Sequence, residues 1–182
     1  TYGVGELLRA AVHAGAKRVI LGLGGSATND GGCGCAAALG IRFLDRDGVS
    51  FVPVGGTLDR LDRIDASGLD PAVRAADITV MCDIDNPLCG PTGASAVFGP
   101  QKGAGPEMVD RLDRNLGHLA DIIRRDLGME IRDLPGSGAA GGMGGGMVAF
   151  LGGRLQMGIE TVLDTVGFDA MVQGASGGLT GE

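Results

Sequence analysis

The residues best suited to chemistry lie in a glycine-rich loop, residues 24–32 (GGSATNDGG), directly after a short apolar segment. The backbone N–H groups of Gly24 and Gly25 and the hydroxyl of Ser26 can bind anionic oxygens. Asn29 adds an amide to the same loop, and the Asp30 carboxylate can hold a metal ion or a substrate hydroxyl. This chemistry favours an anionic substrate. The alternative is an ordinary strand-to-helix turn in which Asn29 or Asp30 caps the helix.

A second polar group, residues 82–90 (CDIDNPLCG), follows another apolar segment. Carboxylates directly past a buried strand lie where α/β proteins bind ligands. We therefore predict that Asp83, together with Asp30, is a Mg²⁺ ligand or orients a substrate hydroxyl, and that Asn86 binds substrate. Turn formation by Asp, Asn and Pro explains the same residues without any ligand.

Two further segments could contact an anion. Lys102 lies among glycines in residues 98–103 (FGPQKG) and could neutralise a phosphate or a carboxylate, with Gln101 binding a carboxylate or an amide edge. A solvated surface lysine is the alternative. Gly138 and Gly141, in a glycine-dense segment that opens a helix, could bind phosphate through backbone N–H groups. Close packing of a helix explains these glycines equally well.

One competing interpretation of the first loop is a dinucleotide-binding unit of the Rossmann type. Gly22, Gly24 and Ala27 form a relaxed version of its glycine fingerprint, and Asp45 follows about twenty residues later, after a second strand. The polar side chains of the loop argue against it, because a dinucleotide turn needs bare backbone there. A third hypothesis is a non-catalytic α/β domain whose glycines serve packing.

The elements that position these groups alternate between strands and helices, which indicates an α/β fold. Apolar runs predict strands at residues 17–23, 41–44 and 78–82. We expect helices over residues 3–14, 33–39 and 158–166, and a helix from residue 136 or later to 151. The longest helix begins at Pro106 and ends before Gly128, since both residues are favoured at those positions.

Composition excludes several classes of protein. The chain has 182 residues, 36 of them glycine, yet 44% are hydrophobic, so a disordered chain is excluded. A net charge of −7 and an aromatic content of 3% argue against nucleic-acid binding. No apolar run is long enough to cross a membrane. The four cysteines lack the spacing of a zinc site, and we expect reduced thiols in a cytoplasmic protein.

Five blocks in order resemble the bacterial glycerate kinases of the glycerate 2-kinase type. The resemblance rests on residues 22–32 (GLGGSATNDGG), 2–7 (YGVGEL), 82–90, 93–104 and 138–142 (GAAGG), with residues 180–182 (TGE) similar to the start of a later motif. The similarity extends over the whole chain without a large gap.

This resemblance implies an enzyme that uses ATP, with Mg²⁺, to phosphorylate glycerate to 2-phosphoglycerate. It implies that the partners are small molecules, glycerate and ATP, and it is compatible with a homo-oligomer. It places Asp30, Asp83 and Lys102 at the positions of catalytic groups. It also implies that the chain is a central piece of a longer enzyme, because the family's N-terminal region with its own Asp/Gly-rich motifs, and the segment that follows the TGE motif, are not in this sequence. We expect residues 1–175 to form the middle α/β domain and residues 176–182 to begin the return into a second, Rossmann-like domain. The chain alone is then expected to be inactive.

Overall fold

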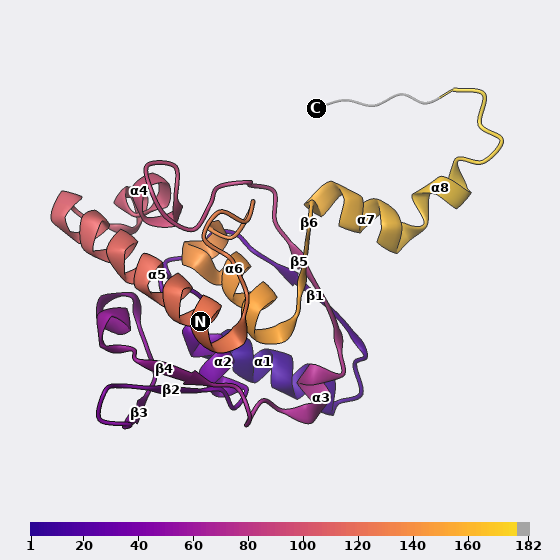
Figure 1. Cartoon of the computed structure of the whole chain (residues 1–182). Helices are drawn as coiled ribbons and strands as arrows, with labels where there is room; N and C mark the ends of the chain where they lie inside the picture. The colour runs from indigo at the N-terminus through magenta and orange to yellow at the C-terminus, as the bar shows by residue number, and fades with distance from the viewer. Residues whose placement is uncertain (178–182) are drawn as a thin grey trace.

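The computed structural model describes residues 1–177 and has the α/β fold that the sequence indicates (Figure 1). Its strands are β1 (Arg18–Gly22), β2 (Arg42–Leu44), β3 (Ser50–Phe51), β4 (Arg63–Asp65), β5 (Asp77–Met81) and β6 (Arg154–Gln156). Its α-helices are α1 (Tyr2–His13), α2 (Cys33–Ala38), α3 (Pro71–Arg74), α4 (Ala94–Phe98), α5 (Pro106–Leu127), α6 (Ala139–Leu151), α7 (Gly158–Val166) and α8 (Phe168–Met171). The short 3₁₀ helices are η1 (Gly55–Arg60) and η2 (Pro100–Lys102).

A parallel sheet with the strand order β1-β5-β6 carries the glycine loop and the Asp83 loop. Ile20 is in register with Thr79, and Val80 with Leu155. The loops after β1 and β5 leave the same edge of this sheet, because parallel neighbouring strands end together. The predicted strands at residues 17–23 and 78–82 are confirmed. The short strand β6, which begins and ends with polar residues, was not predicted.

The second predicted strand does not join this sheet. β2 instead lies between β3 and β4 in a separate antiparallel sheet, where Phe43 is in register with both Phe51 and Ile64. The Rossmann interpretation required β1, α2 and β2 to form one parallel unit, so it is wrong. Asp45 does not serve a nucleotide ribose; its carboxylate accepts hydrogen bonds from the backbone N–H groups of Asp47 and Val49 in the turn that follows β2.

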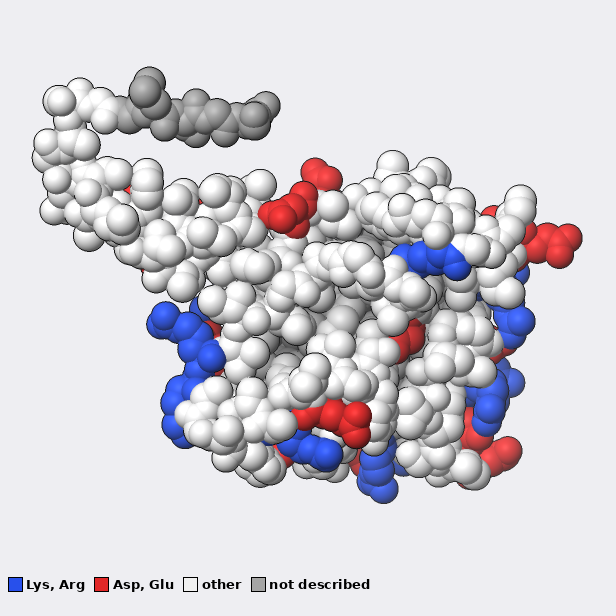
Figure 2. Space-filling view, turned by 180° about the vertical axis from the view of Figure 1, so that it is seen from behind, with Lys and Arg blue, Asp and Glu red and all other residues white. Residues whose placement is uncertain are grey.

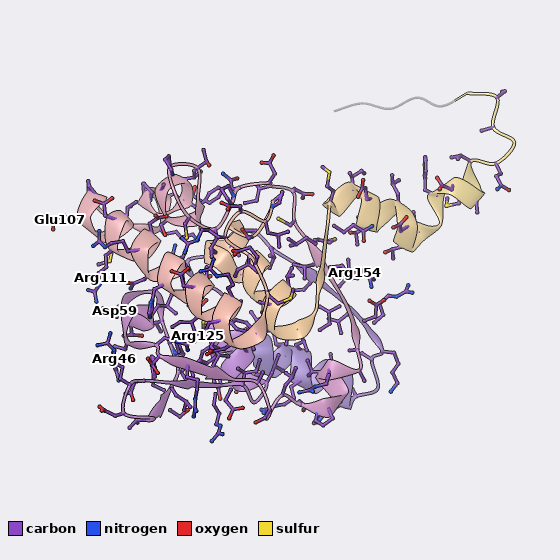
Figure 3. The ribbon with its side chains drawn as sticks, in the orientation of Figure 1. Arg46, Asp59, Glu107, Arg111, Arg125 and Arg154 are labelled. Atoms are coloured by element: carbon purple, nitrogen blue, oxygen red, sulfur yellow. The ribbon has the colours of Figure 1, made fainter. Side chains whose placement is uncertain are left out.

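The longest helix, α5, packs against η1 and against β4 of the antiparallel sheet, and it also contacts α4 and α6. It begins at Pro106 and ends before Gly128, whose φ of 71° is the left-handed conformation typical of a helix end. Its apolar face is buried in the common core, together with residues of α1, α2 and α6. Figure 3 shows Arg111 of α5 and Asp59 of η1 on the same side of the molecule, where an ion pair of 3.7 Å joins them.

Helix α6 begins irregularly. Residues 140–142 have φ angles of 50°, 67° and 90°, so the chain makes a left-handed turn before the regular helix. Ala140 is the one non-glycine residue with positive φ in the described part of the chain. The sequence predicted a helix opening in this segment but not its left-handed turn.

Helices α7 and α8 extend away from the rest of the molecule (Figures 1 and 2). α7 has the bounds that the sequence predicted, and Asp83 contacts its first residue. Residues 178–182 lie outside the described chain, and with them most of the predicted second domain. In residues 1–177 no helix is both long enough and apolar enough to cross a membrane.

Candidate functional site

Two cavities meet at Lys102, beside the loops that follow β1 and β5. The first, of about 500 Å³, is lined by Leu23, Gly24, Gly25, Ser26, Ala27, Asp83, Ile84, Phe98, Gln101, Lys102, Ala139 and Ala140. The second, of about 420 Å³, is lined by Thr1, Ala27, Thr28, Asn29, Asp30, Val54, Gly55, Gly56, Gly99, Lys102, Gly103, Ala104, Met108 and Leu112. Lys102 and Ala27 line both cavities. Most of the predicted site residues therefore face one of two adjoining spaces.

The Lys102 ammonium is held by neutral acceptors. Its Nζ donates to the Thr28 carbonyl oxygen at 2.7 Å and to Ser26 Oγ at 3.4 Å. Among the described residues, Lys102 forms no ion pair with a carboxylate. Partial burial lowers the pKa of Lys102, and the charge of Asp30 opposes that shift. Its positive charge is thus available to an anion in either cavity.

Gly24 and Gly25 of the glycine loop line the first cavity. A Cβ added at Gly24 or Gly25 would meet no other atom within 4 Å, so packing does not require glycine at either position. Gly25 has a φ of 56°, which glycine adopts without strain. The open space beside both residues permits a ligand to approach the backbone closely. This arrangement is compatible with the predicted binding of anionic oxygens by Gly24, Gly25 and Ser26.

Asp30 is buried, and its carboxylate accepts hydrogen bonds from several protein donors. Oδ1 accepts from the Gly32 N–H at 3.0 Å, and Oδ2 accepts from the Gly34 N–H at 3.2 Å and from Thr1 Oγ1 at 2.6 Å. These bonds satisfy donors at the beginning of α2, as a capping carboxylate does. The geometry therefore favours the capping alternative that the sequence left open for Asp30.

Asp83 lines the first cavity, while its Oδ1 accepts a hydrogen bond of 2.7 Å from the Gly158 N–H at the beginning of α7. Asp30 lines the second cavity, so the two carboxylates predicted as Mg²⁺ ligands or hydroxyl-orienting groups line different, adjoining cavities. No group of three or more His, Cys, Asp or Glu side chains that could hold a metal occurs in residues 1–177. Asp83 alone remains suited to contact an ion carried by a ligand.

The other predicted residues differ in their surroundings. Asn29 exchanges weak hydrogen bonds with Ser95 Oγ at 3.3 Å and lines the second cavity. Gln101 lines the first cavity. Asn86, in contrast, lines neither cavity, and its Nδ2 donates to the Thr92 carbonyl at 2.8 Å. Its geometry is that of a residue that stabilises a loop.

The predicted glycines of the later segment serve close packing. A Cβ at Gly138 would lie 2.3 Å from the Pro87 carbonyl oxygen, and one at Gly141 would lie 2.0 Å from the Thr28 carbonyl oxygen. Neither residue lines either of the two cavities at Lys102, which favours the packing alternative over phosphate binding. The sequence prediction omitted Thr28 and Ala140, whose importance depends on contacts between segments more than 100 residues apart.

The whole sequence matches one family model. Residues 1–182 match the model described as "Glycerate kinase family". The chain belongs to the glycerate kinase family. The resemblance that the five sequence blocks indicated is thereby confirmed.

Relatives within the glycerate kinase family are similar over the entire chain. A glycerate kinase of Bacillus subtilis (strain 168) is 52% identical over 182 residues, which are 100% of this chain and 48% of the relative. A glycerate 2-kinase of Escherichia coli (strain K12) is 47% identical over 180 residues, 99% of this chain and 47% of the relative. The chain spans about half the length of these curated relatives.

The fold is also that of a solved structure. A crystal structure from Salmonella typhimurium LT2, described as a glycerate kinase 2, is 51% identical and superposes with a TM-score of 0.92. The match covers 96% of this chain and 46% of that one. This chain therefore shares its α/β architecture with the matched part of that structure.

Proposed function

We propose that the protein containing this chain transfers the γ-phosphoryl group of ATP to a hydroxyl of glycerate and forms 2-phosphoglycerate. Among the relatives, the glycerate 2-kinase of Escherichia coli supports this proposal, because its sequence is similar to this chain over nearly the whole length of the chain. The chain would supply the Lys102 region of the site. Its four free cysteines suit the reducing cytoplasm, where we place the protein.

One observation of the structure carries this proposal. Lys102 places a partly buried ammonium at the meeting point of two cavities, and its bonded acceptors are a carbonyl and a hydroxyl. Phosphoryl transfer from ATP to glycerate brings together two anionic groups, the phosphate chain of ATP and the carboxylate of glycerate. A cation with neutral partners at such a junction can stabilise the charge of the transferring group.

The reaction forms one bond and breaks one. The glycerate hydroxyl oxygen attacks the γ-phosphorus, the bond from the γ-phosphorus to the β,γ-bridging oxygen breaks, and ADP leaves with that electron pair. The hydroxyl proton passes to solvent or to a carboxylate that lines the site. Gly24, Gly25 and Ser26 bind phosphate oxygens, and the protein acts chiefly by positioning the reactants.

Magnesium would enter with ATP, since Mg²⁺ in kinase sites is bound by phosphates together with one or two carboxylates. Asp83 fits this requirement because its side chain lines the first cavity. Asp30 fits it poorly, because its carboxylate already accepts hydrogen bonds from Gly32, Gly34 and Thr1. When bound, the ion would neutralise charge on the phosphate oxygens.

The test is turnover by a full-length protein that contains this chain. ADP release should require both ATP and glycerate, and phosphorus NMR of the mixture should show 2-phosphoglycerate as the new signal. Glycerate-independent ADP release would indicate a plain ATPase. Absence of a phosphorylated glycerate in the presence of ATP and Mg²⁺ would contradict the proposal.

A further inference from the structure

We propose that the left-handed turn at residues 140–142 positions Lys102, and that it acts through Thr28. In this proposal Thr28 and Gly141 are positioning residues, since neither is required to touch a substrate. The inference rests on the proposed function only in assigning an anion to Lys102. The contacts that position Lys102 lie within the chain and need no ligand.

Thr28 connects the turn to the lysine with its two oxygens. Its Oγ1 donates a hydrogen bond of 3.1 Å to the Ala140 carbonyl oxygen. Its own carbonyl oxygen accepts the shorter of the two Lys102 bonds, at 2.7 Å. A single residue of the glycine loop thus contacts both the left-handed turn of α6 and the ammonium at the junction of the cavities.

Gly141 fixes the place of the same carbonyl. A Cβ at this position would lie 2.0 Å from the Thr28 oxygen and 2.6 Å from Asn29 Cα, distances at which atoms must move apart. The Gly141 carbonyl oxygen also accepts a hydrogen bond of 3.0 Å from the Gly31 N–H. The backbone of the glycine loop therefore contacts the backbone of the left-handed turn directly, with no side chain between them.

The conformation of Ala140 supports a specific role for this turn. Its φ of 50° and ψ of 46° are left-handed, a conformation that alanine rarely adopts because its Cβ comes too close to the following carbonyl oxygen. Such strain persists only where the surrounding contacts determine the conformation. Here the contacts are those of the glycine loop, and Ala140 itself lines the first cavity beside Lys102.

Holding the Lys102 ammonium by an uncharged carbonyl, and not by a carboxylate, has a chemical consequence. A carboxylate would hold an ammonium more tightly than a carbonyl does, but it would also compete with an incoming anion. The Thr28 carbonyl orients the Lys102 ammonium and leaves its net charge uncompensated. The turn at residues 140–142 therefore fixes the position of the Lys102 ammonium and leaves its positive charge free to interact with the anion of the proposed reaction.

The experiment measures proton exchange between the Lys102 ammonium and water by NMR of the ¹⁵N-lysine-labelled chain. Lys17 and Lys102 are the two lysines of the sequence, so a Lys17→Arg background leaves one lysine signal. Thr28→Val in this background removes the hydroxyl but keeps the side-chain shape, and Thr28→Ser restores the hydroxyl. Thr161→Val is the matched control, because Thr161 Oγ1 likewise donates to a backbone carbonyl, that of Met157 at 3.0 Å.

We expect a slowly exchanging Lys102 signal in the background protein, in Thr28→Ser and in Thr161→Val. Exchange should be at least about fivefold faster in Thr28→Val, because the carbonyl that holds the ammonium is no longer fixed. Gly141→Ala should show the same effect if it folds. Equal exchange in Thr28→Val and in the background protein would overturn the proposal. So would a Lys102 ammonium that exchanges freely in the background protein.

A titration with inorganic tripolyphosphate separates this proposal from the proposed function. If the background protein binds it and Thr28→Val binds it at least about fivefold more weakly, both proposals are supported, since a misplaced cation loses part of a charge-assisted contact. If exchange changes as expected but tripolyphosphate does not perturb the Lys102 signal, the positioning stands and the anion assignment of Lys102 fails.

Discussion

Asp30 was predicted as a catalytic or metal-binding carboxylate, and its surroundings are those of a helix cap. We expect Asp30→Asn to lower the free energy of unfolding by about 1–3 kcal/mol, because an amide nitrogen would face the donors of Gly32 or Gly34. Urea denaturation measures this effect.

Asp45→Asn is the control, since Asp45 accepts backbone bonds in a turn that asparagine also favours, and its 3.5 Å ion pair with the exposed Arg60 contributes little. It should change stability little. If Asp30→Asn left stability unchanged but reduced turnover of the full-length enzyme by orders of magnitude, Asp30 would be catalytic after all.

The cysteines were expected to behave as small apolar residues, and two of them are completely buried. Burial raises the pKa of the Cys35 thiol to about 12 and that of Cys33 well above its usual value, and the nearby Asp30 charge adds to both shifts. At pH 8 their thiolate forms are scarce, so an aromatic disulfide reagent should modify neither in the folded chain. Rapid labelling of Cys33 or Cys35, read by peptide mass spectrometry before unfolding, would refute this description.

At the scale of elements, Gly146 of α6 and Gly3 of α1 differ in whether packing requires glycine. A Cβ at Gly146 would lie 2.0 Å from the Gly31 carbonyl oxygen, whereas one at Gly3 of α1 would meet nothing within 4 Å. Gly146→Ala should therefore destabilise the protein by about 3 kcal/mol or more, as overpacking against backbone does. Gly3→Ala should stabilise it by about 0.5 kcal/mol through helix propensity. Similar effects of both substitutions in urea denaturation would show that packing does not explain the glycine content of α6.

Elements with strong local signals were predictable from the sequence. α5 has apolar residues every three or four positions, Pro106 at its beginning and Gly128 at its end, and the structure confirms these bounds. β1 and β5 were predictable as apolar runs. β3 and β6 have two and three residues, too few for any periodic pattern to mark them.

The site was predictable in part, because some of its residues also have strong local sequence signals. The glycine loop, Asp83 and Lys102 stand out by residue type, and the structure brings them to adjoining cavities. Local sequence could not reveal that β2 leaves the parallel sheet, since pairing depends on distant partners. It also could not reveal the bond from Lys102 to Thr28, which spans 74 positions of the chain.

At the scale of the whole molecule, the chain has about half the length of the relatives that it matches. We expect the isolated 182-residue chain to show no kinase turnover, because the proposed reaction needs two substrates enclosed in a complete site. A coupled assay of ADP release with glycerate, ATP and Mg²⁺ decides this. Turnover near ordinary kinase rates by this chain alone would show that its own cavities are sufficient.

Lys102 is the residue on which the proposed reaction depends most, and steady-state kinetics of the full-length enzyme test its role most directly. Steady-state kinetics should be compared for the parent, Lys102→Ala and Lys17→Ala, the last being the control at the other lysine. Lys102→Ala should lower kcat/KM for glycerate by at least about tenfold, or ~1.4 kcal/mol of transition-state stabilisation, while Lys17→Ala matches the parent. Equal values of kcat and KM for both substrates in the parent and in Lys102→Ala would contradict the assignment of Lys102 to the active site.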